Sequence, residues 1–258
     1  MRKSRFWTAV CLLLVSALLL AVFPMQTEAK SADGKTVIVI DPGHGGSDPG
    51  AQEPPFGEGA MTLYLSLWEA QYLQCYDNVE VYLTRTDDSS VGLKERVNFA
   101  VSKHADFFAC NHFNDSENPA VSGGSEVYVS INQSLFPQEA FFAQTELDEL
   151  STLGLNVRGI KFRVGDHGDY YSVLRNCSKN GLEGAIIEHC FLNNENDRKY
   201  LGGGDTAALQ NVLQTMAYAD ARAIAKHLHL KSTIMGVDYT DYQESEITWP
   251  VLPFSADM

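Results

Sequence analysis

The sequence has few cysteines, and no two of them form a CxxC pair. The five are Cys11, Cys75, Cys110, Cys177 and Cys190. A structural zinc knuckle normally needs paired CxxC motifs, so this class of small zinc domain is excluded. Cys110 and Cys190 each lie two residues from a candidate site residue, His112 and Glu188 respectively. A disulfide between them is open in an exported protein, although buried free thiols are the simpler expectation.

Basic residues are also scarce. The chain has 19 Lys and Arg against 33 Asp and Glu, which gives a formal net charge of -14. Such an acidic chain argues against nucleic acid and against anionic membrane surfaces as partners. An anionic substrate would have to be attracted by a local patch or by a metal ion.

Long apolar runs are absent except near the first residue. Phe6–Phe23 is almost wholly apolar and follows basic residues within the first five positions, while Thr27–Ala29 resembles a small-residue cleavage site. This order predicts a signal peptide over residues 1–29 and export to the cell wall or the extracellular space. An uncleaved membrane anchor is the alternative, because the run is about long enough to span a bilayer.

Internal repeats are absent too, and the rest of the chain alternates between strand and helix patterns. Strands are expected at 37–40, 79–84, 106–112, 124–130, 171–174 and 185–191, and helices at 59–76, 90–104, 136–153 and 206–228. This alternation predicts a single α/β domain with a central, mostly parallel, twisted sheet of about six strands flanked by helices. We assign residues 30–230 to this domain.

Residues 231–258 form a tail of different composition. From Val237 onward it carries acidic residues but no basic one, and its aromatic residues are interleaved with Pro250 and Pro253. Such a tail either packs on the body of the domain or docks a protein partner. The chain is otherwise expected to be a monomer.

Three predicted strands end in residues that can do chemistry. His44 follows the strand 37–40 among three glycines, His112 ends the strand 106–112, and Glu188 lies near the end of 185–191. In sheets of this class, ligands bind beyond the carboxyl ends of the strands. We therefore expect these side chains to share one crevice, where they could build a metal-dependent hydrolase site.

The residues alone leave the roles at this site open. A hydrolytic zinc site needs about three protein ligands and one open position. The chain supplies His44, His112 and two candidate acids, Glu58 and Glu188. Each histidine could instead be structural, and Glu58 could simply complement the dipole of the helix that follows it. Asp41 could orient His44 or cap the turn beside it.

Several sequence blocks occur in the order found in a known family. They are IDPGHGGSDPGA (40–51), Glu58 with Thr62-Leu63, LTRTDD (83–88), LKERV (93–97), NHFN (111–114), VLRN (173–176) and EHCFLNN (188–194). From about residue 36 to 228 the chain resembles the zinc-dependent N-acetylmuramoyl-L-alanine amidases of bacterial autolysins and wall hydrolases. Single blocks are moderately specific, whereas all of them in order are highly specific.

The resemblance implies roles for four residues. His44, Glu58 and His112 would be the ligands of one zinc ion, and Glu188 would be the general base and acid. The substrate would be peptidoglycan, cut at the amide bond between N-acetylmuramic acid and L-alanine. Cys190 differs from the glycine that is more common in the family, but it is not a catalytic position.

Two other functions stay open at this stage. One is a zinc peptidase that cuts within the stem peptide of peptidoglycan. The other is a catalytically silent peptidoglycan-binding or regulatory protein of the same fold. The presence of all four expected site residues weighs against the silent protein.

Overall fold

The computed structural model describes residues 34–120 and 123–253. The expected signal peptide, residues 1–29, and the end of the tail after Pro253 lie outside this part of the chain. Within these two ranges, no helix is both long and apolar enough to cross a membrane. The division into signal peptide, catalytic domain and tail therefore stays a prediction.

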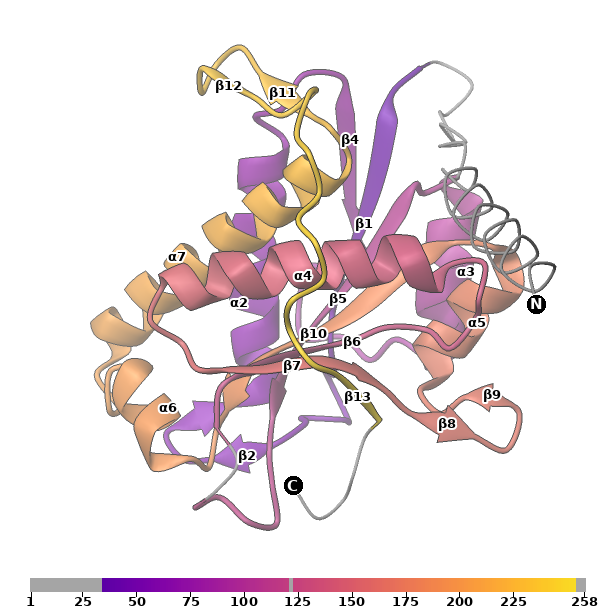
Figure 1. Ribbon diagram of the computed structural model, residues 1–258. Helices are drawn as coiled ribbons and strands as arrows, with labels where there is room; N and C mark the ends of the chain where they lie inside the picture. Colours follow the sequence, from indigo (N-terminus) through magenta and orange to yellow (C-terminus); the bar gives the residue numbers. More distant parts are fainter. Residues whose placement is uncertain (1–33, 121–122, 254–258) are drawn as a thin grey trace, which may run out of the picture.

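A seven-stranded sheet forms the centre of the molecule (Figure 1). In spatial order its strands are β13 (Val251–Pro253), β7 (Val157–Phe162), β6 (Ser125–Tyr128), β10 (Glu183–Phe191), β5 (Phe107–Asn114), β1 (Thr36–Pro42) and β4 (Val79–Leu83). Strands β6 and β10 pair antiparallel, and the other neighbours pair parallel. The predicted mostly parallel α/β sheet is confirmed, with one strand more than expected.

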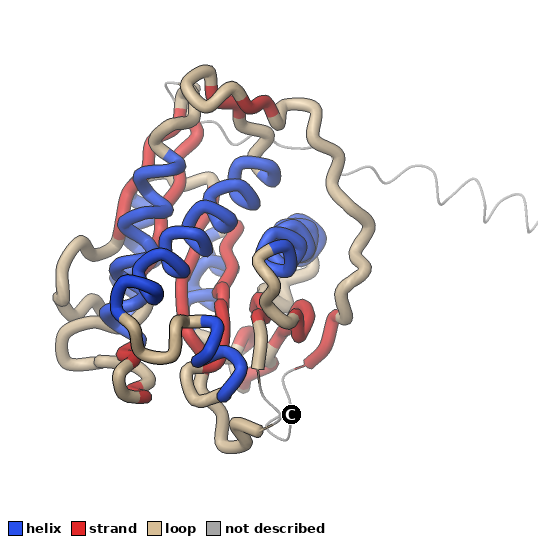
Figure 2. The backbone as a smooth tube through the Cα atoms, turned by 90° about the vertical axis from the view of Figure 1, so that its left-hand side faces the viewer, coloured by secondary structure: helices blue, strands red, loops and turns tan. Residues whose placement is uncertain are grey.

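Helices cover both faces of this sheet. One face packs against α2 (Glu58–Leu73), α4 (Phe136–Thr152) and α7 (Thr206–His227), and the other against α3 (Leu93–Ser102) and α5 (Ser172–Asn180). Figure 2 shows the strands between the helices. The remaining elements are a short helix, α6 (Glu195–Tyr200), and three small hairpins, β2 (Gln52–Glu53) with β3 (Phe56–Gly57), β8 (Val164–Gly165) with β9 (Gly168–Asp169), and β11 (Lys231–Ser232) with β12 (Val237–Asp238).

The pattern of β1 follows from this double coverage. Ile38 and Ile40 pack in the core on the α2, α4 and α7 side, whereas Val39 packs on the α3 and α5 side. A strand buried on both faces reads as a continuous apolar run rather than as an alternation. Burial of each such side chain contributes about 1.5–3 kcal/mol to folding, so the run anchors the strand that precedes His44.

The prediction of a strand at 171–174 is wrong, because these residues begin helix α5. Val173, Leu174 and Cys177 are buried against the sheet, at the spacing of one helical face. The helix ends at Gly181, which has a φ of 66° and so forms a left-handed cap. A short apolar run does not by itself distinguish a strand from a buried helix turn.

The tail packs on the body through residue 253. It passes over α4 in Figure 1 and adds β13 to the edge of the sheet beside β7. The indole of Trp249 donates a hydrogen bond to Asp148 (2.8 Å), and the backbone of Thr248 and Trp249 donates to Gln144 (2.8 and 3.0 Å). Docking of a protein partner by this tail stays a prediction.

Candidate metal centre

Three neighbouring parallel strands bring their carboxyl ends to the same edge of the sheet. They are β1, β5 and β10, with β5 in the middle. His112 and Glu188 are register partners in β5 and β10, so their side chains lie next to each other on one face. His44 comes two residues after the last residue of β1. The expected convergence of the three strand ends is therefore present.

His44 lies in a tight loop with an unusual backbone. Its φ is 60°, and the two glycines that follow have φ values of 115° and 60°. A left-handed conformation is uncommon outside glycine and often marks a functional site. In this loop, His44 Nε2 lies 3.1 Å from Glu58 Oε1.

Glu58 is the first residue of α2 and the centre of the cluster. Its Oε1 lies 2.9 Å from His112 Nδ1 and accepts a hydrogen bond from the backbone N–H of Phe113 (3.1 Å). Its Oε2 accepts one from the backbone N–H of Ala51 (2.8 Å). These donors fix the carboxylate, and its place at a helix N-terminus stabilises its negative charge.

The imidazoles of His44 and His112 stand edge to face, with ring centroids 4.8 Å apart. This approach requires a glycine at position 43. A Cβ on Gly43 would lie 2.4 Å from His112 Cε1, which is closer than real contacts allow. Gly50 is equally confined, because its Cβ would lie 2.4 Å from Glu58 Oε2.

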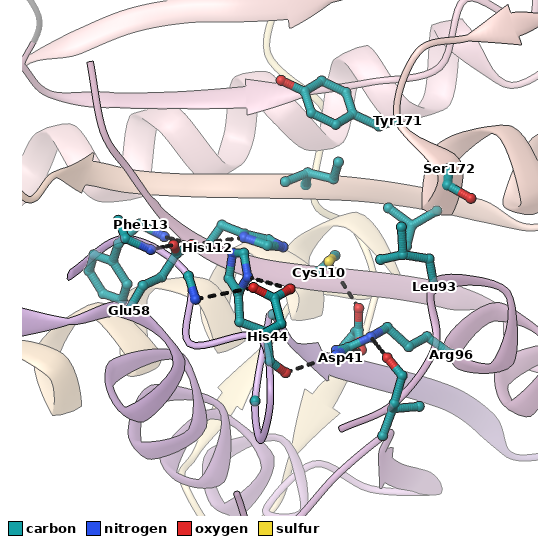
Figure 3. A pocket seen from close by; sticks show the side chains of 18 of the residues that line it. Asp41, His44, Glu58, Leu93, Arg96, Cys110, His112, Phe113, Tyr171 and Ser172 are labelled. Carbon is teal, nitrogen blue, oxygen red and sulfur yellow. Dashed lines mark hydrogen bonds and ion pairs between the residues drawn. The ribbon is translucent and has the colours of Figure 1, made fainter. Parts of the chain in front are cut away.

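The donor set of this cluster suits zinc. One ligand atom from each of His44, Glu58 and His112 lies within 4.8 Å of the others, and Figure 3 shows the three side chains turned toward one another. Two imidazole nitrogens and one carboxylate oxygen are usual ligands of a catalytic zinc ion, which keeps one position open. A cavity of about 800 Å³ opens on the cluster. Across residues 34–120 and 123–253, no other three His, Cys, Asp or Glu side chains come this close together.

Electrostatics favour a cation at this position. Burial would raise the pKa of Glu58, but hydrogen bonds and charge interactions with His112 and His44 lower that pKa well below its usual value. Burial would lower the pKa of His44, yet the carboxylates of Glu58 and Asp48 raise that pKa overall. The Glu58 carboxylate thus stays ionised and attracts positive charge, which a divalent metal ion can supply.

Glu188 lines the same cavity but lies outside the cluster of three. Burial, followed by the negative charges of Glu58 and Glu126, raises the pKa of Glu188 well above its usual value. Its Oε2 has no hydrogen-bond partner among the residues described. A carboxyl group with a raised pKa and a free oxygen is suited to proton transfer.

Asp48, rather than Asp41, is the aspartate whose carboxylate lies beside His44. The carboxylate of Asp41 pairs with Arg96 (2.8 Å) and accepts a hydrogen bond from the thiol of Cys110 (3.0 Å). Asp48 Oδ2 lies 3.0 Å from His44 Nδ1, which is an ion-pair contact without the alignment of a hydrogen bond. The sequence analysis missed Asp48, although its spacing of four residues from His44 was visible.

Cys110 and Cys190 are both buried free thiols, so the disulfide left open by the sequence is not formed. Cys110 belongs to the core on the α3 and α5 side, and Cys190 to the core on the opposite face of the sheet. Neither thiol belongs to the cluster around Glu58.

Comparison with known proteins points the same way as this geometry. The family model for N-acetylmuramoyl-L-alanine amidase matches residues 38–226. The N-acetylmuramoyl-L-alanine amidase CwlM of Bacillus licheniformis is 33% identical over 187 residues, which is 72% of this chain and 68% of that protein.

Solved structures also have a similar fold. The amidase AmiC2 of Nostoc punctiforme matches with a TM-score of 0.62 and 29% identity, over 76% of this chain and 98% of that one. Cwp6 from Clostridium difficile matches with a TM-score of 0.66 and 29% identity, over 75% of this chain but only 29% of that one. Since the family model covers most of the described sheet and all the residues of the cluster, the chain belongs to the N-acetylmuramoyl-L-alanine amidase family.

Proposed function

We propose that this protein hydrolyses the amide bond between the lactyl group of N-acetylmuramic acid and L-alanine in peptidoglycan, with one zinc ion at the cluster of His44, Glu58 and His112. Family membership supports an amidase of this kind. The observation that carries the proposal is the meeting of these three side chains beside Glu188, at the wall of one cavity.

The zinc ligands would be His44, His112 and the Glu58 carboxylate. When bound, zinc lowers the pKa of a water molecule to about 7 and polarises the carbonyl group that is attacked. Glu58 is held in place by the backbone N–H groups of Ala51 and Phe113 (2.8 and 3.1 Å), so the ligand is oriented before the ion arrives.

Glu188 is the proposed general base and acid. Its raised pKa suits it to take a proton from the attacking water and to give that proton to the leaving nitrogen. The C–N bond of the amide breaks, the carbonyl carbon becomes the carboxyl group of the lactyl ether, and L-alanine leaves with a free amino group. The strand pairing with His112 keeps Glu188 beside the ligand cluster throughout.

Product analysis with purified peptidoglycan tests this function. We expect mass spectrometry to detect intact glycan strands and peptides with an N-terminal L-alanine, and we expect a chelator to stop their release. Cleavage between residues of the stem peptide would instead indicate a peptidase. Stoichiometric zinc without any cleavage would indicate a silent wall-binding protein.

Loss of a ligand tests the metal assignment separately. His44→Ala should lose both zinc and activity, because only two ligands would remain. His167→Ala is the matched control, since this histidine lies outside the cavity lining and the ligand cluster. Stoichiometric zinc in the His44→Ala protein would contradict the assignment.

We further propose that the protein acts after export, with residues 1–29 as a cleaved signal peptide and 30–230 as the catalytic domain. Family membership supports an action on the cell wall. N-terminal sequencing of protein recovered outside the cytoplasm should begin at Lys30, and size-exclusion chromatography should give a monomer. An intact Met1 in membrane fractions would indicate an uncleaved anchor.

A further inference from the structure

Two buried arginines contact the loop that carries His44. They are Arg85, which follows β4, and Arg96 in α3, and they are 3% and 4% exposed. Neither belongs to the ligand cluster. Their hydrogen-bond acceptors are mainly backbone carbonyl groups, several of them in this loop. The two side chains therefore bear on the conformation of the loop.

Arg96 holds the loop from one side. Its Nη1 donates a hydrogen bond to the carbonyl of Pro42 (2.7 Å), and its Nη2 donates one to the carbonyl of His44 itself (2.8 Å). Its Nε donates to the carbonyl of Val91 (2.9 Å), and its ion pair with Asp41 compensates the charge. One guanidinium group therefore fixes both ends of the turn from Pro42 to His44.

Arg85 holds the same loop from the other side and joins it to the start of α2. Its Nε donates to the carbonyl of Pro42 (2.9 Å), and its Nη2 donates to the carbonyls of Gly43 and Gly59 (both 2.8 Å). Gly59 directly follows Glu58. Arg85 thus links the His44 loop to the helix turn that carries Glu58, together with the hydroxyl of Thr62 in α2, which also donates to the carbonyl of Gly43 (2.8 Å).

The carbonyl groups of Pro42, Gly43 and His44 therefore all accept hydrogen bonds from these two side chains. A buried guanidinium must satisfy its fork of donors, because an unpaired buried charge is strongly unfavourable. The two guanidinium groups can therefore be buried only when the loop presents its carbonyl groups to them, and this requirement fixes the conformation of the loop. Lysine keeps the charge but has no planar fork, so its compact ammonium group cannot reproduce this arrangement of donors.

We propose that Arg85 and Arg96 are positioning residues that hold His44 in its left-handed conformation, at the correct distance from Glu58, before the metal ion binds. The inference rests on the proposed role of His44 as a zinc ligand. Removing a residue that orients a metal ligand through hydrogen bonds typically lowers metal affinity by about 10–100-fold.

The test compares zinc affinity in arginine-to-lysine variants. Arg96→Lys and Arg85→Lys should each bind zinc about 10–100-fold more weakly in competition with a chelator. With Co²⁺ in place of zinc, the visible absorption spectrum should also change, because it reports the geometry of the ligands. Arg222→Lys is the matched control, since Arg222 pairs with Glu149 between α7 and α4 and should keep wild-type affinity and spectrum.

Weaker zinc binding could come from a general loss of stability or from displacement of His44, so the two causes have to be separated. Leu147→Ala removes a fully buried side chain of α4, so it should lower the melting temperature while zinc affinity is retained. If the lysine variants do not fold, Ser90→Ala tests whether hydrogen bonds to this loop affect zinc binding. Ser90 Oγ donates to the carbonyl of Gly45 (3.2 Å) and accepts from the N–H of Ser47 (2.8 Å), so its loss should weaken zinc binding to a smaller extent.

Wild-type zinc affinity in the folded Arg96→Lys and Arg85→Lys proteins would overturn the proposal, as would wild-type affinity in Ser90→Ala if neither lysine variant folds. Equal losses in Leu147→Ala would also overturn it, because stability alone would then explain them. Failure of the proposed function has a different signature. In that case the wild-type protein itself would bind no stoichiometric zinc, or would bind it and leave peptidoglycan intact.

Discussion

At the scale of the residue, substitution of Glu188, the proposed base, should separate metal binding from turnover. It lies beside His112 on the neighbouring strand but outside the ligand cluster. Glu188→Ala should therefore retain stoichiometric zinc while kcat falls by about 10²–10⁴-fold, the range for loss of a general acid or base. Glu195→Ala, at the exposed start of α6, is the control and should behave as wild type. Full activity in Glu188→Ala would rule out this base.

The lack of a side chain at Gly43 matters for the metal centre. A methyl group there would overlap the His112 ring at 2.4 Å, whereas one on Gly57 would meet nothing closer than Gln52 at 3.4 Å. We expect Gly43→Ala to lose zinc binding and Gly57→Ala to keep it, although Gly57 directly precedes Glu58. Zinc titration of the two variants checks this, and equal affinities would contradict the expected overlap.

Some residues of this site can be predicted from the sequence pattern, and others cannot. His44, His112 and Glu188 are visible as polar residues at the ends of apolar strands. Glu58 has no such signal, because it begins a helix. The residues alone make it one of two candidate acids, and the family resemblance is what implies its role as a ligand. Arg85 and Arg96 are hidden for another reason: their partners are backbone carbonyls, and these carry no side-chain pattern.

At the scale of the element, β7 and β13 show where pattern reading fails. β7 reads Val-Arg-Gly-Ile-Lys-Phe, and Gly159, whose φ is 101°, breaks its alternation of apolar and charged residues. A Cβ at this position would lie 2.5 Å from the carbonyl oxygen of Pro250. The glycine therefore allows the tail to approach β7, and this contact joins residues too distant in sequence for a local pattern to reveal.

Trp249 should account for much of the tail's attachment. Its indole N–H bonds Asp148 (2.8 Å), and its half-buried ring packs against the core on the α4 side. We expect Trp249→Ala to lower the free energy of unfolding by about 2–3 kcal/mol, somewhat below the range for a fully buried aromatic residue. Because β7 and β6 separate β13 from β10, β5 and β1, the strands of the metal centre, kcat should be unchanged.

Urea denaturation and activity assays together check this expectation. Ile247→Ala is a suitable control, since Ile247 is 37% exposed and should cost little stability. A Trp249→Ala protein with wild-type stability would mean that the tail does not hold to the body through this residue. A large fall in kcat would mean that the tail also supports the site.

At the scale of the whole molecule, buried ionisable groups set the response to pH. Burial raises the pKa of Glu139 to about 8 even though the N–H groups of Ser130 and Gly184 donate to its carboxylate. Burial likewise raises the pKa of Asp220 to about 8. Both residues lie in helices on the same face of the sheet, α4 and α7. Each native carboxyl group thus keeps a proton that the unfolded chain has already lost.

His227, in the last turn of α7, acts in the same sense. Burial would lower its pKa, but Glu183 (3.1 Å from Nε2) and Glu244 in the tail (3.5 Å from Nδ1) raise it to about 9. A histidine with a raised pKa stabilises the folded state fully below about pH 6.5. This stabilisation is lost as the pH rises through 9.

These groups predict that the protein is most stable in mildly acidic solution. Between about pH 4.5 and 9 these three groups bind more protons in the native state than in the unfolded chain, so their contribution to the free energy of unfolding should fall as pH rises. Melting temperatures measured from pH 5 to 9, with a chelator present so that metal binding does not contribute, should therefore decline steadily.

In Glu244→Gln the loss of one negative neighbour lowers the pKa of His227, so the steepest part of the decline above pH 7 should move to lower pH. Stability that rises toward pH 9, or an unchanged profile in Glu244→Gln, would contradict this coupling of the tail to the domain.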